Sequence, residues 1–202
     1  IHAKKNHGII IGQGPDTMGY SAAALSFQLP ELSNPVIFTG SQRSPDRPSS
    51  DAHLNLEGSA KAAMSDLGEV CIAMHETTDD LGVALWRGTR TRKNHSSKRN
   101  AFTSLNDEPI GVVNENIEWN GKYRSLRDKT IIKAGFDEDI ALIWAHPGLK
   151  SEDWENIVSS KKGVVVAGTG LGHINSNLLE TIGKTAKDIP VAMSTQCLAG
   201  TT

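Results

Sequence analysis

Hydrophobic residues gather in six short runs along the chain, and stretches of helical length separate these runs. Each run is continuously apolar rather than alternating, which is typical of central strands in a parallel sheet, covered on both faces. The runs occupy residues 7–12, 35–40, 69–74, 139–145, 163–168 and 190–195. Amphipathic stretches predict helices at residues 17–29, 51–65, 151–159 and 174–187. This rhythm predicts βαβ units and an α/β fold with helices on both faces of the sheet.

The rhythm of strands and helices is interrupted between about residues 76 and 138. Within this part polar and apolar residues alternate, and Asn120 and Gly121 form a pair that favours a tight hairpin turn. We therefore predict a hairpin with its turn at 120–121, and two α/β lobes. The expected division is an N-terminal lobe with a parallel sheet at 1–115, a linker or hairpin at 116–137 and a smaller C-terminal lobe at 138–202.

Both ends of the sequence suggest that the two lobes are truncated. The chain begins with what reads as the end of a helix, followed at once by a strand, and it closes with a strand and a loop. A compact α/β domain seldom starts or stops at such a point. We therefore expect a fragment that lacks segments of both lobes.

Composition and charge are those of an ordinary globular protein. The 202 residues suffice for one large domain, and 38% of them are hydrophobic and 22% charged. The formal net charge of −2 does not indicate a nucleic-acid or membrane binder, and no apolar run approaches the roughly 18 residues of a membrane helix. We expect a cytoplasmic protein that does not contact a membrane.

The sequence contains no cofactor motif, so we predict neither a metal nor another cofactor. The seven histidines lack metal-ligand spacing, and His75 and Glu76 have no second ligand pair nearby. Residues 167–175 read AGTGLGHIN, which is not the dinucleotide spacing, and we interpret these glycines as needed for strand-to-helix packing. Cys71 and Cys197 lie in apolar runs without a C-x-x-C pair, and we predict buried free thiols in a reducing compartment.

Three loops follow predicted strands and are candidates for a site, because open α/β sheets bind ligands at the carboxyl ends of their strands. The first, residues 12–18, places Gly14, Asp16 and Thr17 just before a helix. Helix capping explains Asp16 and Thr17 as well as a site does.

The other two loops are rich in charge. Residues 40–51 carry charged and hydroxyl side chains, which are Arg43, Asp46, Arg47, Ser49, Ser50 and Asp51. This loop is either a surface loop, in which Ser50 or Asp51 caps the next helix, or the wall of a polar pocket. The basic run at 87–99 is a solvated loop, a contact for an anionic partner such as phosphate or RNA, or the source of a lysine turned inward as a base.

Taken together, these loops resemble those of the L-asparaginase/glutaminase family, above all its archaeal branch of Glu-tRNA(Gln) amidotransferase D subunits. In the family the first strand is followed by HGTDTM, and here residues 13–18 read QGPDTM. Further similar stretches are YSAAALSFQL, GSQRSPDRPSSDAHLNL, RGTRTRKNHSSKRNAFTSLND and GVVVAGTGLGHIN. The resemblance runs through the whole chain and implies an asparaginase-like two-lobed fold.

The resemblance also assigns roles to individual positions. The family uses a Thr-Asp-Lys group, whose Asp corresponds to Asp16, whose Lys corresponds to Lys93 and whose Thr corresponds to Pro15. It implies that Asp16 contacts the amino group of the substrate, that Gly14 belongs to the substrate site, and that the backbone at Ser41 meets the side-chain amide. The family's other threonine centre, a glycine-rich turn, lies outside this sequence.

Proline at position 15 removes the hydroxyl that this group requires. It offers neither an Oγ nor an N–H, whereas Gly14 tolerates the restriction that a proline imposes on the residue before it. We therefore expect the turn to form but the chemistry to be crippled. Thr17 is a weak substitute, because successive residues of a turn point in different directions.

The resemblance implies release of ammonia from the side-chain amide of glutamine or asparagine. In the archaeal branch it implies a homodimeric assembly and transfer of this ammonia to a partner, the E subunit of the amidotransferase, which converts Glu-tRNA(Gln) to Gln-tRNA(Gln). Two alternatives remain open. One is a free-standing asparaginase of the same fold, and the other is a scaffold protein of the same complex that has lost turnover.

Overall fold

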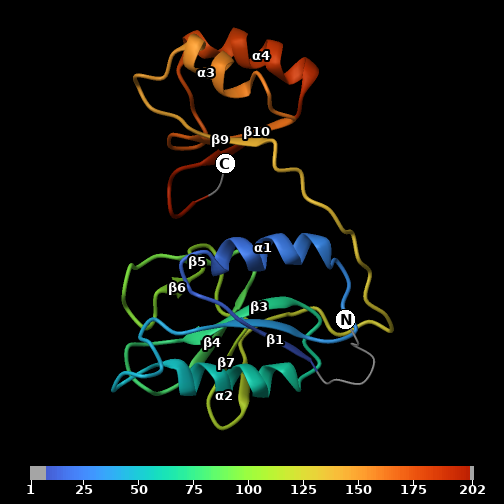
Figure 1. Ribbon diagram of the computed structural model, residues 1–202, viewed down its shortest axis with the longest axis vertical. Coiled ribbons are helices and arrows are strands. Elements are labelled where there is room, and N and C mark those ends of the chain that lie inside the picture. The colour runs from blue at the N-terminus through green and yellow to red at the C-terminus, as the bar shows by residue number, and fades with distance from the viewer. Residues whose placement is uncertain (1–7, 201–202) are drawn as a thin grey trace. The chain divides into compact units, whose positions relative to one another are not determined.

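The computed structural model describes residues 8–200, which form two compact units that divide between Ala134 and Gly135 (Figure 1). The first unit contains a six-stranded sheet with the order β1-β2-β3-β4-β7-β8. Its strands are β1 (Ile9–Gly12), β2 (Val36–Thr39), β3 (Val70–His75), β4 (Val83–Arg87), β7 (Gly111–Val113) and β8 (Ile117–Trp119). The first three are parallel to one another, and the other three continue the sheet in antiparallel pairs.

Two helices cover opposite faces of this sheet, α1 (Met18–Gln28) and α2 (Ala52–Ala63) (Figure 1). Strand β2 shows why Val36, Ile37 and Phe38 are all apolar, since all four residues of the strand are buried. Phe38 packs in one core cluster with Met18 of α1, whereas Ile37 packs in another with Ala62 of α2. The continuous apolar run here reflects a central strand, as predicted.

The prediction of a central strand is wrong for some of the other apolar runs. Among residues 8–200, β1 lies at the edge of the first sheet, and β9 (Ile140–Trp144) and β11 (Val191–Thr195) form the two edges of the second. Their burial alternates or is incomplete, with Ile10 and Met193 exposed. A run of apolar residues does not distinguish a strand with two neighbours from a strand with one.

A hairpin forms in this part of the chain, but it lies earlier than the predicted one and comprises β7 and β8. β7 pairs antiparallel with β8, and the turn between them comprises residues 114–116. The predicted turn at 120–121 is wrong, because the Asn120 N–H donates to Ile110 O (2.9 Å) and continues the pairing past β8. The hairpin therefore lies within the sheet of the first unit.

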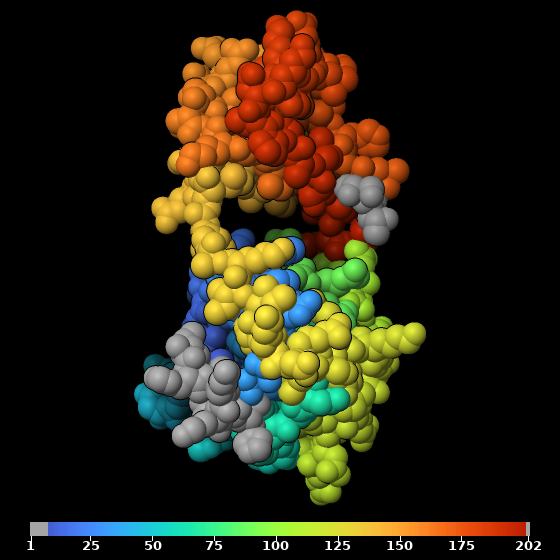
Figure 2. All heavy atoms as spheres, turned by 90° about the vertical axis from the view of Figure 1, so that its right-hand side faces the viewer, coloured from blue at the N-terminus to red at the C-terminus, as the bar shows by residue number. Residues whose placement is uncertain are grey.

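The chain after the hairpin, yellow in Figure 2, lies across one face of the first unit, and it contains no strand between Trp119 and Ile140. Isolated bridges join Ser125 to Leu67 and Ile131 to Glu31. This segment ends where the second unit begins.

The second unit is a three-stranded parallel sheet with the order β11-β10-β9. Its other elements are β10 (Gly163–Gly168), α3 (Ser151–Val158), the short 3-10 helix η2 (Ser176–Leu178) and α4 (Leu179–Asp188). Trp154 of α3 is fully buried in the core of this unit, and its Nε1–H donates to Thr185 Oγ1 (2.9 Å) on α4. Alternate residues of β9 are exposed, including Leu142 and Trp144.

Candidate active site

The turn after β1 is fixed by hydrogen bonds on both of its sides. The Gln13 N–H donates to Thr39 O (2.9 Å) and ties the turn to β2. The Gln13 side chain donates to Thr17 Oγ1 (3.0 Å) and Ser21 Oγ (2.9 Å), which ties it to α1. Thr17 occupies the N-cap position of α1 but makes no side-chain capping bond. Capping therefore does not account for Thr17.

Lys93 reaches this turn from a separate two-stranded sheet, formed by β5 (Arg92–Lys93) and β6 (Phe102–Thr103). Lys93 lies opposite the fully buried Phe102 in this pairing. Its Nζ donates to Asp16 Oδ1 at 2.5 Å, although 77 residues separate the two along the chain. The Lys93 side chain is 14% exposed and that of Asp16 87% exposed. The structure thus brings together two of the predicted site residues and turns this lysine of the basic run inward.

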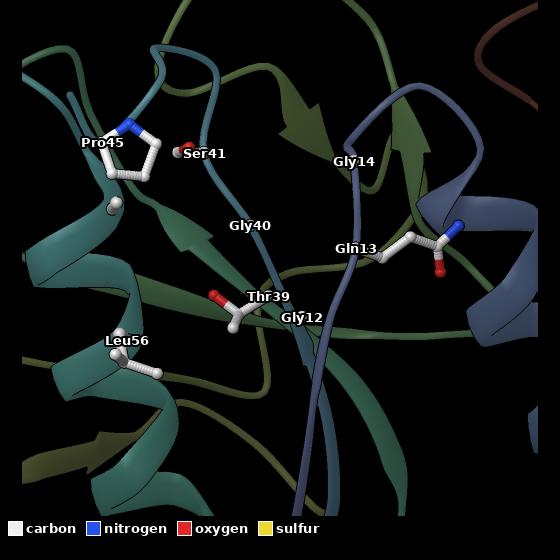
Figure 3. Close-up of a pocket in the computed structure, with 9 residues that line it drawn as sticks. Gly12, Gln13, Gly14, Thr39, Gly40, Ser41, Pro45 and Leu56 are labelled. Atoms are coloured by element: carbon white, nitrogen blue, oxygen red, sulfur yellow. The ribbon is translucent and has the colours of Figure 1, made fainter. Parts of the chain in front are cut away.

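A pocket of about 440 Å³ opens at the carboxyl ends of β1 and β2 (Figure 3). Its lining consists of Gly12, Gln13, Gly14, Thr39, Gly40, Ser41, Pro45, Ala52 and Leu56. Two of these, Gly14 and Ser41, are predicted substrate positions. Figure 3 shows that the Gln13 side chain turns away from the pocket towards α1, whereas Pro45 and Leu56 stand on the side of α2. A volume of this size lies within the ordinary range for small-molecule sites.

The backbone of the pocket wall approaches the turn after β1 very closely at Gly40. A Cβ added at Gly40 would lie 2.2 Å from Gln13 O, whereas one added at Gly14 would meet nothing within 4 Å. Gly40 is therefore sterically required. Sequence reasoning missed this glycine and the pocket-lining Thr39, although both stand at the carboxyl end of a predicted strand.

Residues 40–51, the pocket loop, are anchored at their base by Asp51. This carboxylate is fully buried and accepts hydrogen bonds from the backbone N–H groups of Gln42 and Arg43, both at 2.9 Å. Asp51 stands at the N-cap of α2 without capping it, and Ser50 Oγ instead accepts from Ala52 N–H (3.2 Å). The loop is therefore exposed at its tip and ordered at its base.

The basic run divides into paired and unpaired cations. Arg87 donates from Nε to Glu69 Oε2 (2.7 Å) and from Nη1 to Asp107 Oδ2 (2.9 Å), and the Glu69 carboxylate raises the pKa of Arg87 above its ordinary value. This arginine is part of the structural frame. Within residues 8–200, the side chains of Arg92 and Lys98 form neither a hydrogen bond nor an ion pair. Their positive charges are therefore available to an anionic partner.

The glycine-rich turn after β10 is a tight reversal. Thr169 and His173 exchange backbone hydrogen bonds at 2.8 and 2.7 Å, and Gly172 has a φ of +97°. A Cβ added at Gly168 would lie 2.6 Å from the Gly172 carbonyl carbon. These contacts explain the glycines as packing requirements. In the part of the chain that the structure describes, no group of three His, Cys, Asp or Glu residues is placed to hold a metal.

The two cysteines differ in environment. Cys71 is fully buried in β3, and burial raises the pKa of its thiol. The predicted burial of Cys197 is wrong, because β11 ends at Thr195 and Cys197 stands in an exposed bend, its N–H donating to Thr195 Oγ1 (3.0 Å). An apolar sequence context at the end of a strand did not place it in the core. No helix within residues 8–200 has the length and apolar character to cross a membrane.

Comparison with known proteins gives the family. The model described as "Asparaginase, N-terminal" matches residues 1–125, and the model described as "Glutaminase/Asparaginase C-terminal domain" matches residues 139–202. The chain belongs to the asparaginase/glutaminase family. The predicted family and the asparaginase-like α/β fold are thereby confirmed.

The relatives of this family member include proteins named as the D subunit of glutamyl-tRNA(Gln) amidotransferase. The one from Thermoplasma volcanium is 41% identical over 198 residues, covering 98% of this chain and 49% of the relative. The one from Saccharolobus solfataricus is 43% identical over 203 residues, covering 96% and 46%. The chain therefore spans about half the length of the curated relatives it matches.

Solved structures of free asparaginases share the fold. The thermostable L-asparaginase from Thermococcus kodakarensis superposes with a TM-score of 0.89 at 32% identity, covering 97% of this chain and 59% of its own. L-asparaginase I from Vibrio cholerae gives a TM-score of 0.83 at 31% identity, covering 97% and 60%. The chain is thus similar both to proteins named as amidotransferase D subunits and to solved structures named as L-asparaginases.

Proposed function

We propose that the full-length protein belongs to the amidase machinery that releases ammonia from the side-chain amide of glutamine or asparagine. The observation that carries the proposal is the contact of Lys93 Nζ with Asp16 Oδ1 at 2.5 Å, at the turn whose Gly14 lines the pocket. The carboxylate of Asp16 suits the ammonium group of an amino-acid amide, and the amine of Lys93 beside it can serve as the base for attack on the side-chain amide.

Each group has a distinct task in this proposal. Asp16 binds the ammonium group of the substrate, and the backbone at Ser41 meets the side-chain amide. Backbone N–H groups at the strand ends stabilise the developing oxyanion, which is typically worth about 3–4 kcal/mol per donor. In this proposal Lys93 takes the proton of an attacking hydroxyl, directly or through a relay.

The hydroxyl is the group that this sequence lacks. Amide hydrolysis needs an activated nucleophile, and Pro15 stands at the position where the resemblance expects a threonine. Thr17 Oγ1 already accepts a hydrogen bond from Gln13, and within residues 8–200 the hydrogen bond of Lys93 Nζ goes to Asp16 instead. We therefore propose that the chain as it stands turns over its substrate poorly or not at all.

We place the protein in the amidotransferase branch. Relatives at about 40% identity are named as the D subunit of glutamyl-tRNA(Gln) amidotransferase, which supports this placement. In this role the protein is a cytoplasmic homodimer that passes ammonia to the partner E subunit, and the complex converts Glu-tRNA(Gln) to Gln-tRNA(Gln). Pro15 favours a second candidate, a scaffold protein of the complex that keeps its surfaces without turnover.

Restoring the hydroxyl tests the proposal. In the full-length protein, assayed together with the partner subunit and Glu-tRNA(Gln), Pro15→Thr is expected to raise ammonia release from glutamine by orders of magnitude, because it introduces an Oγ beside Lys93 and Asp16. Coupled enzymatic detection of ammonia measures this. The double variant Pro15→Thr with Lys93→Met is the control and is expected to return to the starting rate.

Other outcomes distinguish the alternatives. Equal turnover with and without Pro15→Thr would contradict the assignment of Asp16 and Lys93 around position 15. Ammonia release without any partner or tRNA would favour a free-standing asparaginase. Tight binding to the partner with no activity in either form would favour the scaffold.

A further inference from the structure

A chain of buried polar side chains lies beneath the pocket loop, and the proposed reaction does not use it. Asp51, Asn55 and His75 are each fully buried. His75 ends β3, whereas Asn55 lies on α2 and Asp51 precedes this helix. Burial of polar groups is costly unless each has a partner, so the partners of these residues indicate what they stabilise.

The hydrogen bonds of Asn55 determine how its amide points. Its Nδ2 donates to Gly40 O (2.9 Å) and to Asp51 Oδ2 (3.1 Å), and both partners are acceptors. Asn55 Oδ1 therefore faces His75 Nδ1 at 2.7 Å, and Nδ1 carries a proton. The other ring nitrogen, Nε2, faces Asp80 Oδ1 at 3.2 Å, which is again an acceptor. Both ring nitrogens of His75 thus face hydrogen-bond acceptors.

The contacts continue from Asp80 to the far end of the pocket loop. Asp80 Oδ1 also accepts from Arg99 Nη1 (2.7 Å), and Arg99 Nη2 donates to Ser49 O. The hydrogen bond from His75, aided by Arg99, holds the pKa of the Asp80 carboxyl below its ordinary value, so this acceptor stays ionised. Gly40 at one end of the loop and Ser49 near the other are thus linked through one histidine.

We propose that His75 is a positioning residue for the pocket: by donating from both ring nitrogens it connects Asn55 to Asp80 and holds both ends of the pocket loop in the conformation that binds the amide substrate. This inference rests on the proposed function, since it takes the pocket as the substrate site. Gly40, whose carbonyl oxygen accepts from Asn55, and the following Ser41 both line the pocket. Breaking the connection weakens substrate binding without removing a reacting group.

The sharpest test substitutes Asp80, because its side chain is 70% exposed and its loss leaves no buried hole. Asp80→Ala removes the acceptor shared by His75 and Arg99. Asp79→Ala is the matched control, since the neighbouring carboxylate has no hydrogen bond or ion pair within residues 8–200. In the full-length protein, we expect Asp80→Ala to raise the Kd for glutamine about tenfold, the scale of one charged hydrogen bond, and Asp79→Ala to leave it unchanged. Equal affinities in both variants would overturn the proposal.

Two measurements without turnover separate this inference from the proposed function. In the native protein, both ring nitrogens of His75 are expected to give the ¹⁵N signals of protonated nitrogens, and the signal of an unprotonated ring nitrogen would overturn the proposal. Backbone amide exchange at Gln42 and Arg43 is expected to accelerate in Asp80→Ala but not in Asp79→Ala, and unaltered exchange would overturn it. If both results hold but the unaltered protein binds no glutamine, the loop-holding role stands and the proposed function is contradicted.

Discussion

At the scale of single residues, the turn after β1 forms although Pro15 supplies no hydroxyl. Met18 N–H still donates to Pro15 O (3.4 Å), and the Gln13 side chain bridges to Thr17. Proline fixes its own φ near about −65°, which suits the start of a turn that enters a helix. Folding and turnover are therefore separable at this position, and a stable protein is no sign of an active one.

The thiols of Cys71 and Cys197 are expected to differ in reactivity, because the first is buried and the second is exposed. The thiolate is the reactive form, and burial suppresses it at Cys71 while Cys197 is exposed. A maleimide added to the native protein should modify Cys197 and leave Cys71 intact until the first unit unfolds. Intact-mass spectrometry before and after denaturant measures this. With Cys197→Ser, the native protein should not react, and rapid labelling of Cys71 would contradict its burial.

At the scale of elements, the sequence predicted the strands and helices that carry a strong pattern. The four predicted helices and six apolar runs match observed elements because each is long enough for its pattern of apolar residues to show in the sequence. The pair β5 and β6 has only two residues per strand, too few for any periodicity. The turn at 114–116 has no glycine, so the Asn-Gly pair at 120–121 gave a stronger but misleading signal.

The candidate site was predictable only in part, for a related reason. The contact of Lys93 with Asp16 joins residues far apart in sequence, and only the family resemblance suggested it. The anchoring role of Asp51 was invisible, because an Asp before a helix equally suggests a cap. Long-range contacts of side chains leave no periodic trace in a sequence.

Replacing two helical glycines by alanine is expected to change the stability of the two units in opposite directions. A Cβ at Gly58 of α2 would lie 2.8 Å from the Cβ of Val83, whereas one at Gly183 of α4 would meet nothing within 4 Å. Gly58→Ala should destabilise the first unit by about 1–3 kcal/mol through overpacking against a stiff β-branched residue. Gly183→Ala should stabilise the second unit by about 1 kcal/mol through helix propensity.

Chemical denaturation of the two single variants measures both effects. Each transition is followed with a probe in its own unit, such as the fluorescence of Trp86 or of Trp154, so that the two free energies of unfolding are resolved. A gain in stability from Gly58→Ala would show that α2 can shift away from β4.

At the scale of the whole molecule, the formal charge of −2 conceals a local excess of cations in the basic run at 87–99. We expect this run to contact the partner protein of the proposed complex. Reversing Arg90 and Arg92 to Glu should weaken complex formation at least about tenfold, because like charges at an interface repel. Surface plasmon resonance against the partner measures the loss, with the exposed Lys129→Glu as the control. Unchanged affinity in the double variant would remove the basic run from the interface.

The division of the chain between residues 134 and 135 determines which substitutions can affect the contacts of the candidate site. The contact of Lys93 with Asp16, the pocket and the side chain of His75 all lie in the first unit. A substitution in the second unit therefore removes none of these contacts.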